Sequence, residues 1–224
     1  IASCLVGSEM CIRDRYYTDA FIDKIRNTPL SIDEWYTQRQ IQQNKQNVDL
    51  FDLGFSTFFL NRTNRSGVLK AGVIGGLQQI GTYKIDARYN KEQLIERIQL
   101  IAQFKDKFIL HNEDAINLLR RYRNIARKNL IYLDPPYYIK GRELYVNFFK
   151  EADHIALSQA IQQRDNMNWI ITYDNHAFIH NLYPNAKSLS YALPYSAGTN
   201  KHGVELLFSK QDIIIPENLL PSLV

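Results

Sequence analysis

The chain has 224 residues, of which 45% are hydrophobic and 22% are charged. This is the balance of an ordinary globular protein with one full domain, or with one domain and a small insert. No apolar run approaches the roughly 18 residues that a bilayer-spanning helix needs, and no signal peptide is recognisable, so we expect a cytoplasmic protein without a membrane partner. The net charge of +4 and the pI of about 8.9 lean mildly toward a polyanionic partner.

The first fifteen residues do not look like part of the fold. Residues 4–15 (CLVGSEMCIRDR) resemble the translation of a transposon adapter used in sequencing libraries, so we set residues 1–15 aside as a leader. Both cysteines, Cys4 and Cys11, lie in this segment. The rest of the chain therefore offers no thiolate for catalysis and no cysteine ligand for zinc. We expect the natural protein to begin upstream of Tyr16.

Residues 16–50 are predicted to be helical. The pattern favours one helix near residues 17–26 and a second that begins at Ser31 and runs through Trp35 and Ile41 to about Asn44. Ser31 can cap the second helix, and Glu34 stands three residues later, as in a capping box.

The composition changes over residues 53–90. Glycines interrupt this stretch, at positions 54, 67, 72, 75, 76 and 81, and polar side chains stand among them, namely Asn61, Arg62, Asn64, Arg65 and Lys70. We predict an irregular, loop-rich insert here, neither a packed helix nor a regular sheet. Loops of this length inside a compact domain usually serve a function.

From residue 90 onward the pattern is α/β. The predicted elements are a helix over 94–102, a strand over 107–110, a helix over 115–122, a buried strand over 129–133, a helix over 155–161, a strand over 169–172, a helix over 177–182, and strands over 188–193 and 204–208. Alternating strands and helices predict a mostly parallel sheet. The last two strands are close enough in sequence to form an antiparallel hairpin at the sheet edge.

The motif that carries chemistry is Asp134-Pro135-Pro136-Tyr137, directly after the strand at 129–133. Ligands of open α/β sheets bind beyond the carboxyl ends of the strands, so this is where an active site would lie. The types of residue suit methyl transfer to adenine N6, a poor nucleophile whose two hydrogens need acceptors. The Asp134 carboxylate can accept one of them and the Pro135 carbonyl the other, on a loop that the prolines stiffen. Tyr137 offers a ring on which an extruded base can stack, so we expect its ring to matter and its hydroxyl not to.

Other interpretations of the motif stay open. A Pro-Pro turn capped by Asp134, with Tyr137 only packing, would look the same in sequence. The first residue of the motif discriminates among amino-group methyltransferases, because Asn there would resemble enzymes that act on protein glutamine or RNA, and Ser would resemble cytosine-N4 enzymes. Asp indicates adenine N6 in DNA.

The chain resembles the Dam-type, D12-class adenine-specific DNA methyltransferases from about Tyr16 to Lys210. The resemblance rests on residues 133–137 (LDPPY), on residues 58–67 (FFLNRTNRSG) and, more weakly, on residues 171–175 (ITYDN). It implies a Rossmann-like S-adenosylmethionine-dependent fold, with residues 16–50 as a helical part of the catalytic domain, 51–90 as a DNA target-recognition insert, 91–215 as the catalytic domain and 216–224 as a tail.

By the same resemblance, two carboxylates would contact the cofactor S-adenosylmethionine. Asp114 matches an acidic position that contacts the cofactor's adenine, and Asp134 would lie near its methionine end. Asp114 can also be read as a helix cap, as can Asn112, because a helix is predicted from Ala115. The cap and the cofactor contact are compatible.

The chain departs from the family pattern at its N-terminus. Members carry a glycine-rich loop of the Phe-x-Gly-x-Gly kind after the first strand, and the chain has no such segment. Gly72, Gly75 and Gly76 are no substitute, because no strand is predicted before them and no helix after them. We therefore expect the first strand and its glycine loop to be missing, and the chain as given to bind S-adenosylmethionine poorly, to be inactive and to be marginally soluble. Calorimetry with the cofactor tests this.

On the DNA side, we predict that Asn61, Arg62, Asn64, Arg65 and Lys70 contact the duplex, because Arg and Lys neutralise phosphates and Asn and Arg can read base edges. A solvated polar loop is the alternative. The polar turn at 195–203 can border the flipped base or be an exposed hairpin, and the aromatic segment 145–149 is read as core or lid. His176 and His180 are four residues apart, but without a third ligand nearby they do not predict zinc.

Three functions remain to be separated. They are methylation of adenine N6 in double-stranded DNA, methylation of another amino group in RNA or at cytosine N4, and DNA binding without activity as a consequence of truncation. We expect a monomer that uses S-adenosylmethionine and no metal, with double-stranded DNA and a cognate restriction endonuclease as its partners.

Overall fold

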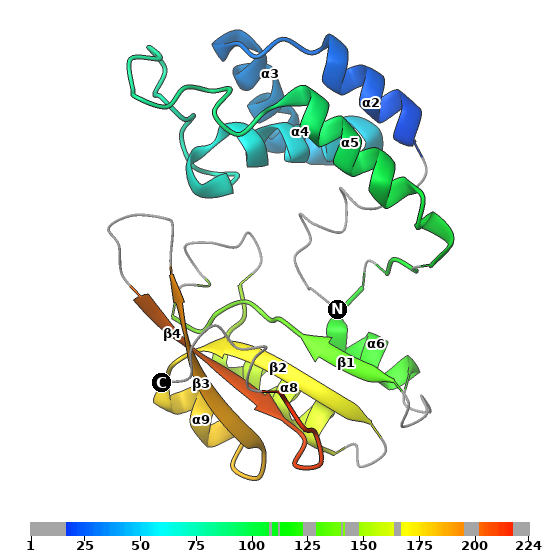
Figure 1. Ribbon diagram of the computed structural model, residues 1–224, viewed down its shortest axis with the longest axis vertical. Helices are drawn as coiled ribbons and strands as arrows, with labels where there is room; N and C mark the ends of the chain where they lie inside the picture. Colours follow the sequence, from blue (N-terminus) through cyan, green and yellow to red (C-terminus); the bar gives the residue numbers. More distant parts are fainter. Residues whose placement is uncertain are drawn as a thin grey trace. The chain divides into compact units, whose positions relative to one another are not determined.

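The computed structural model describes residues 17–107, 109–111, 113–122, 129–139, 141, 148–163, 167–194 and 202–216. These residues belong to two compact units, divided between residues 112 and 113 (Figure 1). The predicted boundaries at 50/51 and 90/91 both fall inside the first unit, and the functional division attached to them stays a prediction. The leader at 1–15 and residues 217–224 of the predicted tail lie outside the described residues.

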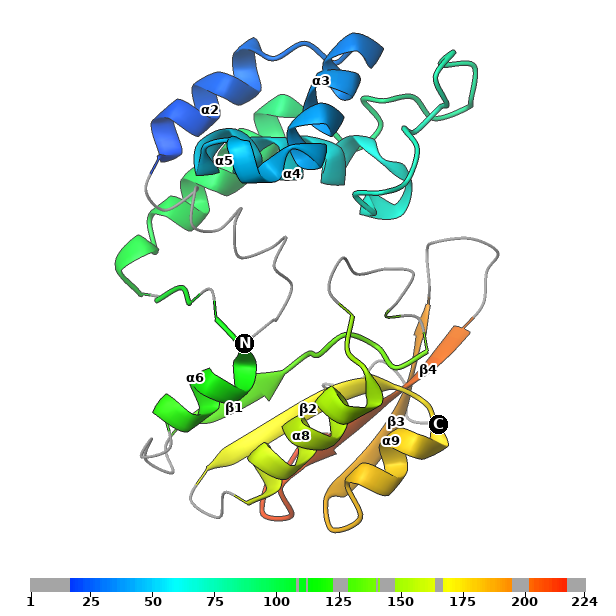
Figure 2. The same cartoon turned by 180° about the vertical axis from the view of Figure 1, so that it is seen from behind.

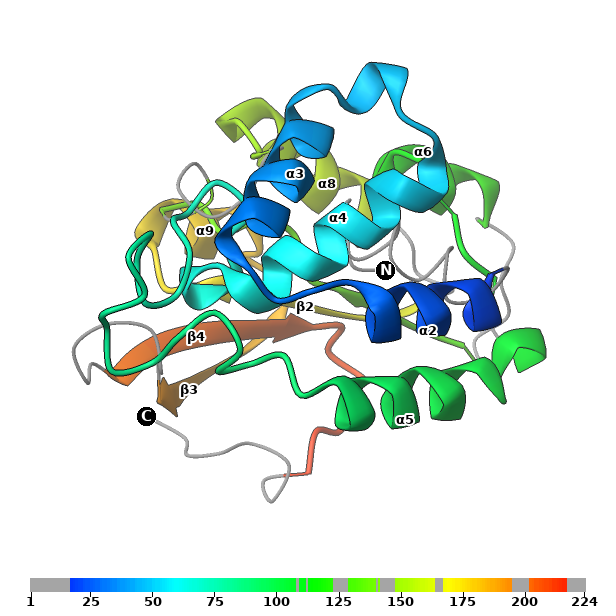
Figure 3. The same cartoon turned by 90° about the horizontal axis from the view of Figure 1, so that it is seen from above.

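The first unit is helical. Its helices are α2 (Thr18–Asn27), α3 (Ile32–Gln43), α4 (Leu50–Thr63) and α5 (Lys91–Ala102), with short 3-10 turns η1 (Lys45–Asn47), η2 (Arg65–Gly67) and η3 (Lys105–Lys107). Figure 3 shows α2 running beside α5, and α3 packs on α4. The predicted helices at 17–26, 31–44 and 94–102 are confirmed.

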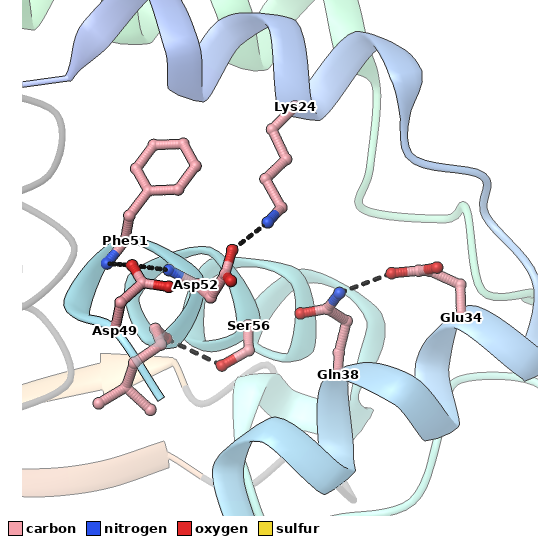
Figure 4. Close-up of polar contacts among 8 residues, drawn as sticks. Lys24, Glu34, Gln38, Asp49, Phe51, Asp52 and Ser56 are labelled. Atoms are coloured by element: carbon pink, nitrogen blue, oxygen red, sulfur yellow. Dashed lines mark hydrogen bonds and ion pairs between the residues drawn. The ribbon is translucent and has the colours of Figure 1, made fainter. Parts of the chain in front are cut away.

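Side-chain caps fix where these helices begin. The hydroxyl of Ser31 accepts a hydrogen bond from the backbone N–H of Glu34 at 3.1 Å, which is half of the predicted capping box. Asp49 caps α4 by accepting from the N–H groups of Phe51 and Asp52 (Figure 4). These bonds satisfy donors that the first turn of a helix leaves without partners. Figure 4 also shows the ion pair of Lys24 with Asp52, which ties α2 to α4.

The prediction for residues 53–90 is wrong in its first third. Residues 53–63 lie in α4 and are almost entirely buried, where Phe55 and Phe59 join a core that also contains Phe21 and Tyr89. Gly54 is tolerated because tertiary packing outweighs its cost of about 1 kcal/mol in a helix. The remainder, from residue 65 to 90, is irregular apart from η2, as predicted.

The second unit is a sheet with helices. Its elements are α6 (Ala115–Arg121), β1 (Leu130–Leu133), α8 (Glu151–Gln162), β2 (Asn168–Asp174), α9 (Ala177–Leu182), β3 (Lys187–Pro194) and β4 (His202–Ser209). The strand order is β1-β2-β4-β3. β1 pairs with β2 in parallel, whereas β4 is antiparallel to both β2 and β3 (Figure 1).

The α/β class and the antiparallel C-terminal hairpin are confirmed, with two corrections to the sheet. First, it is mixed rather than mostly parallel, because β4 inserts between β2 and β3 and so replaces a parallel pairing by two antiparallel ones. Second, no strand forms among the described residues of the predicted 107–110 segment, because Lys107 ends the 3-10 turn η3 and residues 109–111 have no regular structure.

The helices α6, α8 and α9 lie on one face of the sheet (Figure 2). The core of the unit lies there, with Leu133 and Ile171 of the strands packed against Leu157 and Ile161 of α8. β1 is not buried throughout as predicted, because its residues alternate between exposed and buried. The opposite face of the strands therefore remains available for polar side chains. Within the described residues, no helix is long and apolar enough to cross a membrane.

Candidate active site

Asp134 stands directly after β1, at the carboxyl end of a strand, as the motif predicts. Its Oδ1 atom accepts a hydrogen bond from Thr172 Oγ1 of β2 at 3.3 Å. The Thr172 oxygen lies 2.9 Å from the hydroxyl oxygen of Tyr132, and since Thr172 has one proton to give, Tyr132 donates to it. The parallel pairing of β1 with β2 places these three side chains side by side. No hydrogen bond to Oδ2 of Asp134 comes from the described residues, so this atom can accept one from a ligand.

The surroundings of Asp134 change its acidity. Partial burial raises its pKa, and the negative charge of Glu205 raises it further, while the hydrogen bond from Thr172 works in the opposite direction. Asp134 is nevertheless exposed at the surface, so a ligand can reach its carboxylate.

The last residue of the motif, Tyr137, is held by Glu205 of β4. Pro135 and Pro136 are buried. The hydroxyl of Tyr137 donates to Oε1 of Glu205 at 2.5 Å, and the hydroxyl of Tyr191 on β3 donates to Oε2 at 2.9 Å. We expected the hydroxyl of Tyr137 to be dispensable, and this bond is the reason to revise that expectation.

Asp174, at the end of β2, holds the chain that leaves the motif. Its Oδ1 accepts from the N–H of Tyr138 at 2.8 Å and its Oδ2 from the N–H of Ile139, also at 2.8 Å. The ring of Tyr138 stacks on Phe178 at 4.8 Å between ring centres. Two charge-assisted bonds to consecutive amides fix the path of the backbone just beyond Tyr137.

Sequence reasoning missed Asp174 and Glu205 as site residues. Asp174 belongs to the ITYDN segment, which contributed only weakly to the family resemblance. Glu205 is 3% exposed and is the single charged residue in an otherwise apolar stretch of β4, Val204–Phe208. An isolated acid in an apolar strand is the signal that could have found it, because a buried carboxylate requires partners.

Asp114 caps α6, which is one of the two roles predicted for it. Its Oδ1 accepts from the N–H groups of Ile116 and Asn117 at 3.0 and 3.1 Å and so caps α6. No hydrogen bond to its Oδ2 comes from the described residues, which leaves this atom for a ligand. Asn112, the other cap considered, lies outside the described residues.

In the first unit, the two asparagines predicted to contact DNA are engaged within the protein. Asn64 is fully buried; its Oδ1 accepts from Trp35 Nε1 at 2.7 Å, and its Nδ2 donates to the carbonyls of Val68 and Leu69. Asn64 therefore has no hydrogen-bonding group left for DNA, and its predicted role is corrected to a structural one. Asn61 is partly buried and donates to the carbonyl of Gly67 at 3.1 Å.

The predicted cations remain available. Arg65 and Lys70 are exposed, and neither makes an ion pair within the part of the chain that the structure describes. Arg62 is half-buried, and its Nε has no hydrogen-bond partner among the described residues. Burial lowers the pKa of Arg62, and the positive charges of Arg88 and Arg97 lower it further. This gathering of like charges favours an anion as its ligand.

A surface cavity of about 510 Å³ lies between α3 and the irregular segment. Its lining is mixed and consists of Trp35, Tyr36, Arg39, Gln40, Gln43, Arg65, Gly72, Val73, Gly76 and Leu77. The guanidinium of Arg39 lies 4.8 Å from the centre of the Trp35 ring. Two guanidinium groups, amides and aromatic rings are the set that recognises a phosphate next to a planar group.

His176 and His180, the two histidines at a possible zinc spacing, have structural partners. His176 caps α9 by accepting from the N–H of Phe178 at 3.1 Å, and the ring of His180 packs edge-on against Phe208. The described residues contain no cluster of three or more possible metal ligands. The polar turn at 195–203 lies outside the described residues up to position 201, as do residues 145–147 of the aromatic segment; Phe149 packs against the core of the second unit.

Comparison with known proteins agrees with this geometry. The family model for D12 class N6 adenine-specific DNA methyltransferases matches residues 7–195, a span that contains the Asp134 motif, Asp174 and the cations at 62–70. A search of curated proteins finds no match. Since the matched span covers far more than half of the chain, the protein belongs to the D12 class N6 adenine-specific DNA methyltransferases.

Proposed function

We propose that the protein transfers a methyl group from S-adenosylmethionine to N6 of an adenine that has been flipped out of duplex DNA. The observation that carries this proposal is the arrangement at the end of β1, where an acidic acceptor, two buried prolines and an anchored aromatic ring follow one another in the chain. Each supplies something that the amino group of adenine needs.

Asp134 and the loop after it do the chemistry that this chain contributes. The carboxylate of Asp134 accepts one hydrogen of the N6 amino group, and the backbone carbonyl of Pro135 accepts the other. Positive charge that develops on nitrogen during methyl transfer is stabilised by these acceptors, which are in place before the reaction begins. The ring of Tyr137 stacks on the extruded base and keeps water from it.

The residues present fit one part of a cofactor site. Oδ2 of Asp114 and Oδ2 of Asp134 both receive no hydrogen bond from the described residues, so both carboxylates can accept from polar groups of S-adenosylmethionine. The cofactor supplies the electrophilic methyl group when it is bound. Asp114, rigid at the cap of α6, would orient the adenosine end, and Asp134 would lie near the methionine end.

We propose that Arg62, Arg65 and Lys70 hold the DNA backbone, with Asn61 beside them. Phosphate contacts position a protein on the duplex and make binding depend on salt. Support comes from the exposure of Arg65 and Lys70 and from the nearby charges of Arg88 and Arg97. The Nε atom of Arg62 also has no hydrogen-bond partner in the described part of the chain. Arg39, on the wall of the cavity that Arg65 also lines, extends the positive surface toward α3.

Methyl transfer with labelled cofactor is the direct test. The protein is incubated with radiolabelled S-adenosylmethionine and duplex DNA free of N6-methyladenine, and the DNA is digested to nucleosides. We expect label in N6-methyldeoxyadenosine. Label in N4-methyldeoxycytidine, or transfer to RNA in its place, would establish the second candidate function. Binding of DNA without any methylated nucleoside would establish the third.

The proposal also includes a monomer and a cognate restriction endonuclease. Gel filtration of the purified protein tests the first. For the second, DNA methylated by the protein is exposed to extracts of the source cells, where we expect it to resist a cleavage that cuts unmethylated DNA.

A further inference from the structure

We propose that Glu205 is a positioning residue, which fixes the ring of Tyr137 through the Tyr137 hydroxyl in the orientation that stacks on the target base. The inference rests on the proposed function, because it assigns the stacking role to Tyr137. Glu205 lies ten residues beyond the span that the family model matches, which ends at residue 195.

Glu205 itself is held rigidly. It lies in β4, where its backbone neighbours are Asp174 of β2 on one side and Tyr191 of β3 on the other. The Tyr191 hydroxyl bonds to Oε2 at 2.9 Å, which leaves Oε1 directed at Tyr137. A side chain that is 3% exposed and fixed at both carboxylate oxygens has little freedom to move. It can therefore transmit the rigidity of the sheet to the ring it holds.

The bond to Tyr137 has the properties of a strong anchor. An O–H donor 2.5 Å from a carboxylate oxygen is at the short end of the range for charge-assisted hydrogen bonds. The prolines before Tyr137 fix the backbone, and Asp174 fixes the backbone after it, so the side-chain torsions of Tyr137 are what remains to be set. The hydroxyl bond to Glu205 restrains these torsions.

A purely structural role would not call for a carboxylate here. Leu207 lies two residues along β4 on the same face, and a leucine at position 205 would fill similar space without the cost of burying a charge. The acid is useful where a specific hydroxyl has to be held in one place. Tyr137 and Asp134, the stacking ring and the acceptor, are then fixed relative to each other before DNA arrives.

Three variants and a double variant test the inference: Tyr137→Phe, Glu205→Leu, Glu205→Gln, and Tyr137→Phe with Glu205→Leu. We expect Tyr137→Phe and Glu205→Leu each to lower kcat by about 10- to 100-fold, the loss of one hydrogen bond to a charged group, with KM for DNA unchanged. Glu205→Gln, which keeps an acceptor oxygen, should recover most of kcat. The double variant should be no slower than Tyr137→Phe alone, since both changes remove the same bond.

The matched control is Glu151→Leu. Glu151 accepts from the hydroxyl of Tyr138 at 2.7 Å, so the control changes the same kind of Tyr–Glu pair one residue further along the chain, and kcat should not change. Losses that multiply in the double variant, or a Glu205→Leu enzyme with normal kcat, would overturn the inference.

The same variants separate this inference from the proposed function. If the unmodified protein transfers no methyl group, the proposed function fails, and the cycle is then read from urea unfolding. In that experiment, the unfolding midpoint of the double variant must equal that of the less stable single variant, because both changes remove the same hydrogen bond. If the shifts of the two single variants add in the double variant, the inference is overturned. If Glu205→Leu does not fold, Glu205→Gln replaces it in the cycle, with a smaller expected loss that must still vanish in the Tyr137→Phe background.

Discussion

Three carboxylates of the site, those of Asp134, Asp174 and Glu205, accept hydrogen bonds from specific donors within the protein. Among the hydrogen bonds from described residues, Asp174 receives two from backbone amides, Glu205 two from phenol hydroxyls, and Asp134 one from a threonine hydroxyl. Asp134 is thus the least satisfied of the three, and it is also the one that the proposed chemistry uses. A group that must bind substrate cannot be fully occupied by the protein.

Asp134→Asn should abolish methyl transfer and leave the protein as stable as before, or more stable. The amide accepts more weakly than a carboxylate, and losing one oriented electrostatic partner costs about 10²–10³ in rate. Because the folded-state pKa of Asp134 is raised, its stabilising contribution is present below the ordinary pKa and is lost as the pH rises through the raised value. At neutral pH the charged form works against folding, and asparagine removes that charge. Initial rates and urea unfolding at pH 7 check the two parts.

The pH dependence of kcat should also reflect the ionisation of Asp134. In the native enzyme, kcat should fall as the pH is lowered through the raised pKa of Asp134, because the protonated acid accepts hydrogen bonds poorly. If the Asp134→Asn variant keeps more than about a tenth of the native turnover, Asp134 is not an oriented acceptor in the reaction.

Asp174→Asn should weaken both the fold and the reaction. The amide keeps one acceptor oxygen for Tyr138 or Ile139 and places an NH₂ group opposite the other N–H. We expect the free energy of unfolding to drop by about 1–3 kcal/mol, the loss of one hydrogen bond to a charged group, together with a lower kcat. Asp212→Asn is the control: Asp212 is exposed and lies 3.7 Å from Lys210, a surface pair worth little. Equal unfolding midpoints for the two variants would show that Asp174 does not clamp the loop.

How far the site could be predicted depends on where its signals lie in the chain. The Asp134 motif is contiguous and follows an apolar strand, so sequence located it. Glu205 is 68 residues from the tyrosine it holds, and the contact exists only because β4 inserts between β2 and β3. Asn64 illustrates the opposite error: a polar residue among arginines suggested DNA, whereas its burial beside Trp35 gives it three partners within the protein.

Elements were predicted best where periodicity was strong and local. The helices at 17–26 and 177–182 and the final hairpin depend on apolar spacing and turns that a short window contains. The prediction for α4 was wrong because Gly54 and the polar residues near its end resemble loop composition. Three aromatic residues of its buried stretch, Phe55, Phe58 and Phe59, instead pack into the core. The position of β4 in the sheet is a tertiary property, and the sequence alone predicted only a mostly parallel sheet with an antiparallel hairpin at its edge.

The segment after α4 should separate into residues that hold it and residues that bind DNA. Asn64→Ala removes the partner of Trp35 and of two carbonyls, so we expect the first unit to lose about 1–3 kcal/mol of stability. Lys70→Ala should leave stability unchanged and reduce the salt dependence of DNA binding by about one unit of slope. Urea unfolding and fluorescence anisotropy at several salt concentrations measure the two effects. A stable Asn64→Ala protein with a flattened salt slope would return Asn64 to the DNA-binding set.

At the scale of the whole molecule, the two units should respond differently to acid. His154 is fully buried in the second unit, with Nδ1 3.0 Å from the Tyr173 hydroxyl and Nε2 without a partner among the described residues. Burial lowers its pKa, so its contribution to stability is present above the ordinary value and is lost as the pH falls through the lowered one. We expect the second unit to lose stability below about pH 6.5, by up to about 1.4 kcal/mol per pH unit for this group.

Fluorescence can follow the units separately, because Trp35 lies in the first and Trp169 in the second. His154→Phe should reduce the acid sensitivity of the second unit, and His180→Phe, at an exposed histidine, is the matched control. If both variants unfold with the same pH dependence as the native protein, His154 is not the group responsible.

The loop that we propose to be catalytic is held by Thr172, Asp174 and Glu205, which all lie in the same unit as the loop itself. The other unit carries the arginines and the lysine proposed to meet DNA. Mutations that alter which duplex is held can therefore accumulate in residues 17–111 without disturbing the acceptor, the ring or their anchors. Under the proposed function, such a division leaves target preference free to diverge during evolution, and residues 17–111 become the segment to exchange in building enzymes that mark new sequences.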